Sequence, residues 1–384
     1  MSVFIETGTA SLSKFGEELC GDNIEVLRNS NSVLCVLADG LGSGVKANIL
    51  SKMTVKIIGT MVEKGATLEE VVETISNTLP ICQKRGIAYS TFTVIQIREN
   101  GEAYVVEFDN PPFFFIREGK LITPEAKETE VYGKKIKESR FQVKTGDILV
   151  VVSDGVVHAG IGGVLNLGWQ WRDVGEYLLR LSSQVTEAKE ISWWLLTACE
   201  QLYTGKPGDD ASVLALKIRE PRSITVAAGP PANKVDDPYM IKLLLSEPGT
   251  KVVCGGTTGA LVADALGTEV KVDLSSMEPD VPPIGHIEGI DLVTEGIITL
   301  SKTLEQLKKP VVPRAAGPGQ KRNAVTQLTK LLLESDRIRF LVGTALNPAH
   351  QNPELSGLSL KMTVVNEIAQ ILKGLGKEVE VQYF

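Results

Sequence analysis

Apolar positions divide the first 220 residues into predicted strands and helices. Val33–Ala38 is a short apolar run, and its length predicts a buried strand that ends at Asp39-Gly40. From Val45 to Val62 apolar residues recur at helical spacing, and Leu68–Leu79 is predicted as a second helix. The chain therefore begins with a buried strand followed by a pair of helices.

A series of strands follows, separated by short turns such as Glu99-Asn-Gly101 that are typical of hairpins. The predicted strands are Thr91–Ile97, Ala103–Phe108, Phe113–Ile116, Ile148–Ser153 and Ala211–Ile218, and the later helices are Asp173–Leu181 and Glu187–Tyr203. Helix pairs inserted into a mostly antiparallel series of strands predict sheets packed together with helices outside.

The pattern changes near Glu220-Pro-Arg-Ser223, which we predict to be a domain boundary. Beyond it, glycine and proline punctuate an α/β pattern. Thr250–Cys254 and Arg337–Val342 are predicted strands, and Ala260–Leu266 is a predicted helix. We therefore expect a first domain of residues 1–220 and a smaller α/β domain of residues 221–384.

The net charge of the chain limits the kinds of molecule that it is expected to bind. The chain of 384 residues has a net charge of −7, with 43% hydrophobic and 23% charged residues, which is ordinary for a soluble globular protein. Residues 1–220 hold 23 Lys and Arg against 29 Asp and Glu, so most of the acidic excess lies there. A nucleic-acid partner bound by phosphate neutralisation is not expected. A cluster of buried carboxylates in this region would instead require cations.

Cysteine spacing and hydropathy bear on the compartment. The five cysteines are scattered without CxxC spacing, which argues against a disulfide framework or a structural zinc site and fits a reducing compartment. The first residues lack the pattern of a signal peptide, and no uncharged apolar run is long enough to span a bilayer. We expect a cytoplasmic protein without a membrane partner.

Four aspartates share an unusual setting at strand ends or loops, each beside glycine or another aspartate: Asp22, Asp39, Asp154 and Asp209. Asp39 and Asp154 directly follow apolar strands, which would deliver their carboxylates to one edge of a core. Buried carboxylates repel each other, so a metal ion commonly holds such a cluster together. Oxygen ligands favour Mg²⁺ or Mn²⁺. Each motif taken alone is also compatible with a plain turn or a solvated loop.

Taken together, six short motifs follow one another with suitable elements between them. They are Gly21-Asp22, Asp39-Gly-Leu-Gly-Ser-Gly44, Ser90-Thr91, Pro111-Pro-Phe-Phe-Phe-Ile-Arg-Glu-Gly119, Gly146-Asp-Ile-Leu-Val-Val-Val-Ser-Asp-Gly155 and Asp209-Asp-Ala-Ser-Val213. Over residues 1–220 this pattern resembles the metal-dependent protein phosphatases of the PPM (type 2C) group, in the branch typified by the stage II sporulation protein E phosphatase. The resemblance implies a β-sandwich flanked by helix pairs.

The resemblance also implies a site with two Mn²⁺ or Mg²⁺ ions. Its metal ligands would be Asp22, Asp39, Asp154 and Asp209, with Asp39 bridging the ions, the Gly40 carbonyl completing a site, and Asp210 in a lesser role. Two-metal chemistry would activate a water molecule to hydrolyse phosphoserine or phosphothreonine. The implied substrate is a phosphorylated regulatory protein, such as an anti-anti-sigma (STAS-type) regulator. The sequence does not decide whether the chain forms a homodimer.

Substrate contacts are less defined. His158 follows Ser-Asp-Gly-Val-Val and is either a general acid or a surface loop histidine. The glycine-rich loop Val156–Arg172 corresponds to a flap in relatives, and its Trp169 and Trp171 either meet the substrate protein or pack on neighbouring helices. Thr91 is a further candidate.

The second domain has a fold class but no recognised function. Between a strand and a helix lies a turn that either cradles an anion or is a plain tight turn, formed by Gly255, Gly256, Thr257, Thr258 and Gly259. His286 and Glu288, with Asp291, have metal-capable side chains but no convincing spacing, and Pro313–Arg322 is either a linker or a contact for a phosphorylated ligand. Two alternatives to a working phosphatase remain: a catalytically silent scaffold, and a small-molecule enzyme centred on the Gly255–Gly259 turn.

Overall fold

The computed structural model describes residues 3–29, 31–78, 90–131, 134–185, 187–309, 323–345 and 360–384. The chain divides into two compact units, Met1–Glu220 and Pro221–Phe384. Each unit has its own sheets and its own apolar core.

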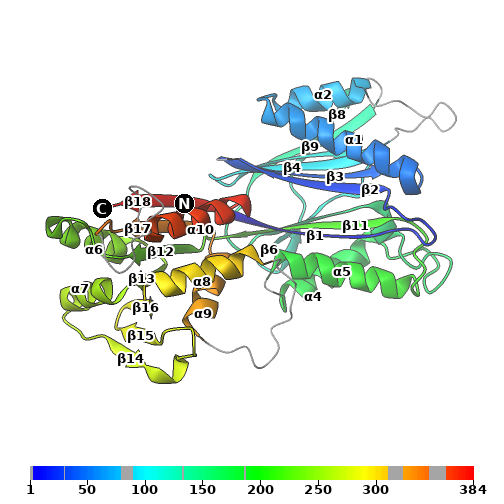
Figure 1. The fold of residues 1–384 in the computed structure, drawn as a ribbon. Helices are drawn as coiled ribbons and strands as arrows, with labels where there is room; N and C mark the ends of the chain where they lie inside the picture. Colours follow the sequence, from blue (N-terminus) through cyan, green and yellow to red (C-terminus); the bar gives the residue numbers. More distant parts are fainter. Residues whose placement is uncertain are drawn as a thin grey trace. The chain divides into compact units, whose positions relative to one another are not determined.

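The first unit contains two antiparallel sheets (Figure 1). The five-stranded sheet has the order β1 (Phe4–Leu12), β11 (Ala211–Arg219), β10 (Ile148–Val152), β6 (Phe114–Arg117) and β7 (Lys120–Ile122). The six-stranded sheet has the order β2 (Asp22–Arg28), β3 (Ser32–Gly40), β4 (Ser90–Arg98), β5 (Glu102–Phe108), β9 (Lys134–Gln142) and β8 (Ala126–Val131). Apolar side chains between the sheets, including Leu37, Leu149 and Leu214, form the central core.

Helices cover the outer faces of both sheets. The helices α1 (Gly44–Glu63) and α2 (Leu68–Thr78) pack on the six-stranded sheet, and α4 (Trp171–Ser182) and α5 (Ala188–Leu202) pack on the five-stranded sheet. A short helix, α3 (Asp154–Val157), follows β10. The sandwich between helix pairs is the fold that the motif resemblance implied, so this expectation is confirmed.

Several strands of the first unit lie where the apolar pattern gave no signal. The strands β1, β2, β7, β8 and β9 were not predicted from the sequence. In β8 the exposed Lys127, Glu128 and Glu130 leave little apolar alternation to detect. Hydrogen bonding to a neighbouring strand, rather than burial of its own side chains, defines such an edge strand.

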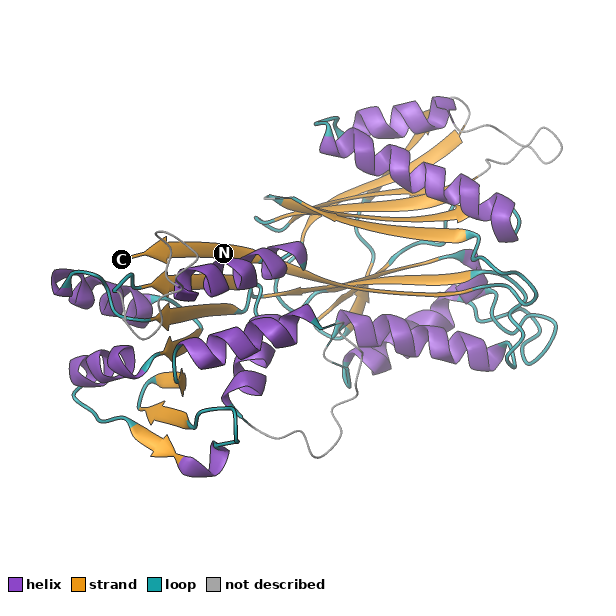
Figure 2. Ribbon diagram, viewed as in Figure 1, coloured by secondary structure: helices purple, strands orange, loops and turns teal. Residues whose placement is uncertain are grey.

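The second unit is built on one seven-stranded sheet (Figure 2). Its order is β14 (Lys271–Asp273), β15 (Ile284–Ile287), β16 (Ile290–Thr294), β13 (Thr250–Cys254), β12 (Ser223–Ala228), β17 (Arg337–Val342) and β18 (Glu378–Tyr383). The five strands from β16 to β18 in this order run parallel to one another. The predicted strands Thr250–Cys254 and Arg337–Val342 are confirmed.

Helices lie on both faces of this sheet. One face carries α6 (Asp237–Ser246) and α7 (Gly256–Leu266), and the other carries α8 (Ile297–Lys308), α9 (Ala324–Glu334) and α10 (Leu360–Gly374). Two short 3₁₀ helices are η1 (Lys234–Asp236) and η2 (Leu274–Ser276).

The predicted turn at 255–259 needs a correction, because α7 already begins at Gly256. Only Gly255 lies outside the helix, where it takes the N-cap position, and the first turn of α7 consists of Gly256, Thr257, Thr258 and Gly259. Thr257 is exposed in this turn, whereas Thr258 is buried. The Gly259 backbone N–H donates to the Gly255 carbonyl at 2.8 Å, which is the first hydrogen bond of the helix. The helix therefore starts four residues earlier than the apolar pattern predicted.

Two other predictions for this unit can also be placed. His286 is exposed on β15, and Asp291 on β16 accepts a hydrogen bond from the Lys251 backbone N–H at 2.7 Å. These side chains belong to a β-hairpin and not to a metal site among the described residues. Pro313–Arg322 lies outside the described residues. Within the described ranges, no helix combines the length and the apolar character needed to cross a membrane.

Candidate metal centre

Strand pairing brings the predicted aspartates to one end of the first unit's sandwich. In the antiparallel β2–β3 pair, Asp22 lies directly opposite Asp39. In the other sheet, Asp154 follows β10 and Asp210 precedes β11, and these two strands pair through Val152 and Val213. The two sheets therefore supply carboxylates from two separate pairs of neighbouring strands.

The electrostatics of the carboxylates show that they lie close together. Burial raises the pKa of Asp39 to about 10, and the negative charges of Asp22, Asp154 and Asp209 add to this rise. Burial likewise raises the pKa of Asp22 to about 7, with further contributions from Asp210 and Asp154. Carboxylates that influence one another in this way share one region of low dielectric.

Some of these oxygen atoms lack any protein partner. Asp22 is 4% exposed and Asp210 is 3% exposed, yet both carboxylate oxygens of Asp22 and Oδ2 of Asp210 have no hydrogen-bond donor in bonding geometry among the described residues. The hydroxyls of Ser153 and Ser212 lie near Asp22 and oppose the rise in its pKa, but neither forms a hydrogen bond of normal geometry with the carboxylate. The other oxygen of Asp210 accepts a hydrogen bond from the Lys14 backbone N–H at 3.0 Å. Buried anionic oxygens without partners are costly, so an additional positive group is needed here.

The Lys14 side chain supplies only part of that positive charge, because it opposes the rise in the pKa of Asp209 that burial and Asp154 cause without reversing it. Among the described residues, none of the ion pairs includes any of the five aspartates, Asp22, Asp39, Asp154, Asp209 or Asp210. A set of carboxylate oxygens suits a hard divalent cation. Over the described ranges, however, no three His, Cys, Asp or Glu side chains stand in a ready-made coordination arrangement. The donor chemistry therefore fits a cation, while ligation by particular residues stays a prediction.

Close backbone contacts fix the loops that carry the carboxylates. A Cβ atom on Gly40 would lie 2.8 Å from Ala47 Cα and would collide with the Ala47 carbonyl, so only glycine fits between β3 and α1. A Cβ atom on Gly155 would similarly collide with the Asp210 carbonyl. The Tyr203 hydroxyl donates a hydrogen bond to the Gly155 carbonyl at 2.7 Å. The glycines beside Asp39 and Asp154 thus allow the tight approach that positions both aspartates.

Asp210 is better placed than its predicted lesser role suggested. Its unpartnered Oδ2 would be 2.7 Å from a Cβ on Gly21, next to Asp22. Asp209 is more exposed, and its Oδ1 accepts a hydrogen bond from the Asp210 backbone N–H at 3.0 Å. Both residues lie near the other carboxylates, because the charge of Asp209 acts on Asp39 and that of Asp210 acts on Asp22, and their roles as ligands stay predictions.

The structure places the two other candidate substrate contacts, Thr91 and His158, in different surroundings. Thr91 lies opposite Asp39 in the β3–β4 register and is partly buried. His158 is exposed at the end of α3, as expected for a surface loop histidine, and its backbone N–H donates to the Asp154 carbonyl at 3.0 Å. The pairing of β3 with β4 therefore places Thr91 beside the end of β3 that carries Asp39.

The two flap tryptophans pack on the domain. Trp169 is 9% exposed and meets Tyr177 edge to face, with ring centroids 5.2 Å apart. Trp171 stacks on Phe114 at 4.8 Å, and its indole N–H donates to the Pro112 carbonyl at 2.7 Å. Trp169 is thus a packing residue rather than an exposed substrate contact. The exposed apolar side chains of this loop are Ile161, Val164 and Leu167.

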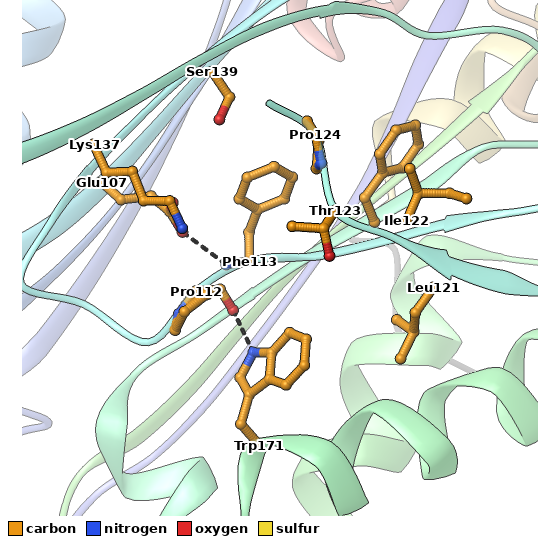
Figure 3. Close-up of a pocket in the computed structure, with 11 residues that line it drawn as sticks. Glu107, Pro112, Phe113, Leu121, Ile122, Thr123, Pro124, Lys137, Ser139 and Trp171 are labelled. Atoms are coloured by element: carbon orange, nitrogen blue, oxygen red, sulfur yellow. Dashed lines mark hydrogen bonds between the residues drawn. The ribbon is translucent and has the colours of Figure 1, made fainter. Parts of the chain in front are cut away.

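Figure 3 shows the small cavity beside the Trp171–Pro112 contact. It measures about 210 Å³, and Phe113 and Trp171 are among the residues that line it. Its polar members include Glu107, whose Oε1 accepts a hydrogen bond from the Phe113 backbone N–H at 2.8 Å. Burial raises the pKa of Glu107. None of the five aspartates is among the residues that line this cavity.

Comparisons with known proteins agree with the motif resemblance. Residues 29–219 match the family model described as stage II sporulation protein E. The chain is 23% identical over 221 residues to the stage II sporulation proteins E of Priestia megaterium and Bacillus subtilis (strain 168). These alignments cover 56% of this chain but only 36% and 26% of the two relatives, respectively.

One of the similar solved structures is the PP2C phosphatase domain with a fragment of the regulatory domain of the cell fate determinant SpoIIE from Bacillus subtilis. It is 22% identical to this chain, with a TM-score of 0.48. That match covers 57% of this chain and 64% of the solved one. Residues 221–384 lie outside the family-model match.

Proposed function

We propose that the first unit is a metal-dependent serine/threonine protein phosphatase, and the match of residues 29–219 to the stage II sporulation protein E family model supports this. The observation that carries this proposal is the group of buried carboxylates at the ends of β2, β3, β10 and β11, with oxygen atoms that lack a hydrogen-bond donor among the described residues. Asp22, which supplies two of these atoms, precedes the matched region but lies within the same compact unit.

The residues of the chain have a positioning role in this reaction. Asp22, Asp39, Asp154, Asp209 and Asp210, with the Gly40 carbonyl, would hold two Mn²⁺ or Mg²⁺ ions. When bound, such ions lower the pKa of a water molecule and stabilise negative charge on the phosphoryl oxygens. The strand ends and the tight glycine contacts hold the carboxylates in place against their mutual repulsion, which limits the rearrangement needed when cations bind.

Hydrolysis assays test this function directly. We expect the purified chain to hydrolyse p-nitrophenyl phosphate and a phosphoserine protein when Mn²⁺ or Mg²⁺ is present, and to stop when EDTA is added. Metal binding without hydrolysis of either substrate would favour the silent scaffold instead. A phosphotyrosine peptide assayed in parallel defines the residue preference.

Metal binding should also stabilise the first unit. Because the cations bind the folded carboxylates and not the unfolded chain, Mn²⁺ at a hundred times its Kd should add about 2.7 kcal/mol to the free energy of unfolding. Differential scanning calorimetry with and without Mn²⁺ measures this shift. The Asp22→Asn variant should lose most of it, whereas an equal shift in that variant would remove Asp22 from the ligand set.

We further propose that the substrate is a folded phosphorylated regulatory protein, for example an anti-anti-sigma type. Three apolar side chains of the flap loop are more than half exposed: Ile161 at 55%, Val164 at 58% and Leu167 at 73%. Exposed apolar groups beside a reaction site commonly mark a protein contact. The exposed part of this loop follows α3 in the chain, and α3 begins with Asp154, one of the carboxylates of the proposed site.

Replacing Val164 and Leu167 together by serine tests this contact. The KM for the phosphoprotein should rise roughly thirtyfold, because two exposed apolar contacts of about 1 kcal/mol each are removed. Hydrolysis of p-nitrophenyl phosphate, which is too small to span the loop, is the control and should be unchanged. Equal losses on both substrates would contradict a docking role and indicate a disturbed site.

A further inference from the structure

The sheet of the second unit has a point where its connections reverse. The chain enters at β12, extends to β13 and β16 on one side, and then crosses to β17 and β18 on the other. The helices α6 and α7 pack on one face, and α8, α9 and α10 pack on the opposite face. In such sheets the loops at the carboxyl ends of the two central strands diverge and leave a crevice where ligands bind. Here that position lies between β12 and β17.

Glycines line this edge of the sheet. Gly229, Gly255 and Gly343 follow β12, β13 and β17, respectively. The Gly229 backbone N–H donates to the Cys254 carbonyl at 3.1 Å, and a Cβ on Gly343 would collide with the Pro230 carbonyl. Gly255 has φ +127°, a conformation that other residues rarely adopt. The edge is therefore formed by closely packed backbone rather than by side chains.

The helix α7 begins at this edge with its first turn uncapped. Its N-cap residue Gly255 provides no side-chain hydrogen bond, and its first turn has no acidic residue. The first backbone N–H groups of a helix have no partner within the helix, and the helix dipole favours an anion beside them. The neighbouring α8 differs, because Glu295 Oε2 accepts a hydrogen bond from the Ile298 backbone N–H at 3.1 Å. A carboxylate of the chain thus occupies the start of α8 but not that of α7.

A buried hydroxyl near this turn also lacks a partner. Thr258 in the first turn of α7 is 0% exposed, and its Oγ1 has no hydrogen-bond partner among the described residues. This oxygen would be 3.4 Å from a Cβ on Gly255, so it faces the N-cap turn. An unsatisfied buried hydroxyl costs free energy, whereas the hydroxyl of the exposed Thr257 can bond to water. An oxygen atom seated in the turn would give Thr258 the missing partner.

A lysine from the other side of the reversal point completes the arrangement. Lys361 lies in the first turn of α10, and a Cβ on Gly229 would collide with its Nζ. Lys361 is half-buried, and within the described part of the chain no carboxylate pairs with it. Burial lowers the pKa of Lys361, and no acidic neighbour opposes this effect. Its ammonium group therefore has no counterion among the described residues.

We propose that residues 221–384 bind a phosphate-bearing small molecule in this crevice, with the phosphate held between the first turn of α7 and Lys361. A phosphate group offers several acceptor oxygens, which suits backbone N–H donors, a hydroxyl and an ammonium group together. Neither the P-loop spacing nor the dinucleotide glycine spacing occurs here, so the site is assembled from two helices that follow different strands. The inference is independent of the phosphatase activity proposed for the first unit.

Isothermal titration calorimetry on the full chain tests the proposal with inorganic phosphate, pyrophosphate and ADP. EDTA is included so that the aspartates of the first unit do not recruit phosphate through a cation. At least one probe should bind at millimolar concentration or below. Equal affinity for pyrophosphate and ADP would indicate recognition of the phosphate group alone, whereas tighter binding of ADP would add recognition of the nucleoside.

Two pairs of variants identify the site. Gly256→Asp places a carboxylate at the open helix terminus, where a Cβ meets no other atom within 4 Å, and should weaken binding roughly tenfold or more while preserving the fold. The neutral Gly256→Asn should bind as the unmodified chain does. Lys361→Met should also weaken binding roughly tenfold, because it removes a charge-assisted hydrogen bond. Lys373→Met, which changes an exposed lysine on the same helix, should not.

The proposal would be overturned in either of two ways. One is the absence of binding for all three probes at millimolar concentration. The other is undiminished binding in both Gly256→Asp and Lys361→Met. Thermal unfolding of each variant without ligand confirms that the second unit remains folded, so a loss of affinity can be assigned to the site.

Discussion

Replacing Asp39 by Asn is expected to abolish metal-dependent phosphatase activity while leaving the protein folded. The negative charges of Asp22, Asp154 and Asp209 all raise the pKa of Asp39, so Asp39 lies close to three other members of the carboxylate group. Loss of one ligand oxygen should reduce kcat by more than the ~10–100-fold seen when groups that only orient metal ligands are removed. The assay is Mn²⁺-dependent hydrolysis of p-nitrophenyl phosphate, repeated with Asp154→Asn.

A matched control and a stability measurement make this result specific. Asp109→Asn changes an exposed aspartate with φ +51°, a conformation that asparagine adopts equally well, and should retain full activity. In the metal-free protein near neutral pH, Asp39→Asn should be about as stable as the unmodified chain, because the raised pKa of Asp39 keeps its carboxyl group protonated and the amide is likewise neutral. Activity that survives both Asp39→Asn and Asp154→Asn would refute the catalytic assignment.

Replacing Gly40 by Ala should strongly lower the stability of the first unit. The added methyl group would meet the backbone of Ala47 in α1, which cannot move aside as a flexible side chain could. Overpacking of this kind costs roughly 1–3 kcal/mol or more. Each kcal/mol lowers the Tm by about 2–4 °C in a domain of this size. Because Gly40 directly follows Asp39, activity should fall together with stability.

The control for this substitution is another glycine of the same unit. A Cβ on Gly163 would lie 3.6 Å from the Gly160 carbonyl oxygen, an ordinary contact, and its backbone conformation is accessible to alanine. Gly163→Ala should therefore unfold at nearly the same temperature as the unmodified chain. Thermal scans monitored by circular dichroism compare the two variants. Equal Tm values for them would show that β3 and α1 can separate without penalty.

The sequence predicts the parts of the fold that have a local apolar pattern, although in α1 that pattern includes side chains that are more than half exposed, namely Val45, Ile49 and Met53. The strands β3 and β10 consist of continuous apolar residues, and α1 and α5 have clear helical periodicity, so each was predicted within one or two residues. The strands β8 and β9 were missed because charged residues dominate them. The order of strands in the second unit could not be predicted, since it depends on pairing between distant segments.

The proposed metal centre and the proposed phosphate site show the same difference between features with a local sequence pattern and features that depend on distant segments. Asp22, Asp39, Asp154 and Asp209 are predicted as ligands because short motifs of glycine and aspartate surround them, and this role stays a prediction. The burial of Asp210 and the lack of a donor to its Oδ2 among the described residues appear only in three dimensions. Lys361 had no local signal at all. Its relation to Gly229 arises because the sheet places β12 beside β17, the strand that precedes α10.

The form of β7 and β8 has a consequence for self-association. Each closes one side of the sandwich, and an unpaired outer strand can template aggregation with another chain. Here β7 has only three residues, and β8 exposes Lys127, Glu128 and Glu130. An incoming strand would find either too few backbone partners or charges of both signs. These two strands therefore discourage addition of a further strand at their own edges of the two sheets, whereas the opposite edges are formed by the longer β1 and β2.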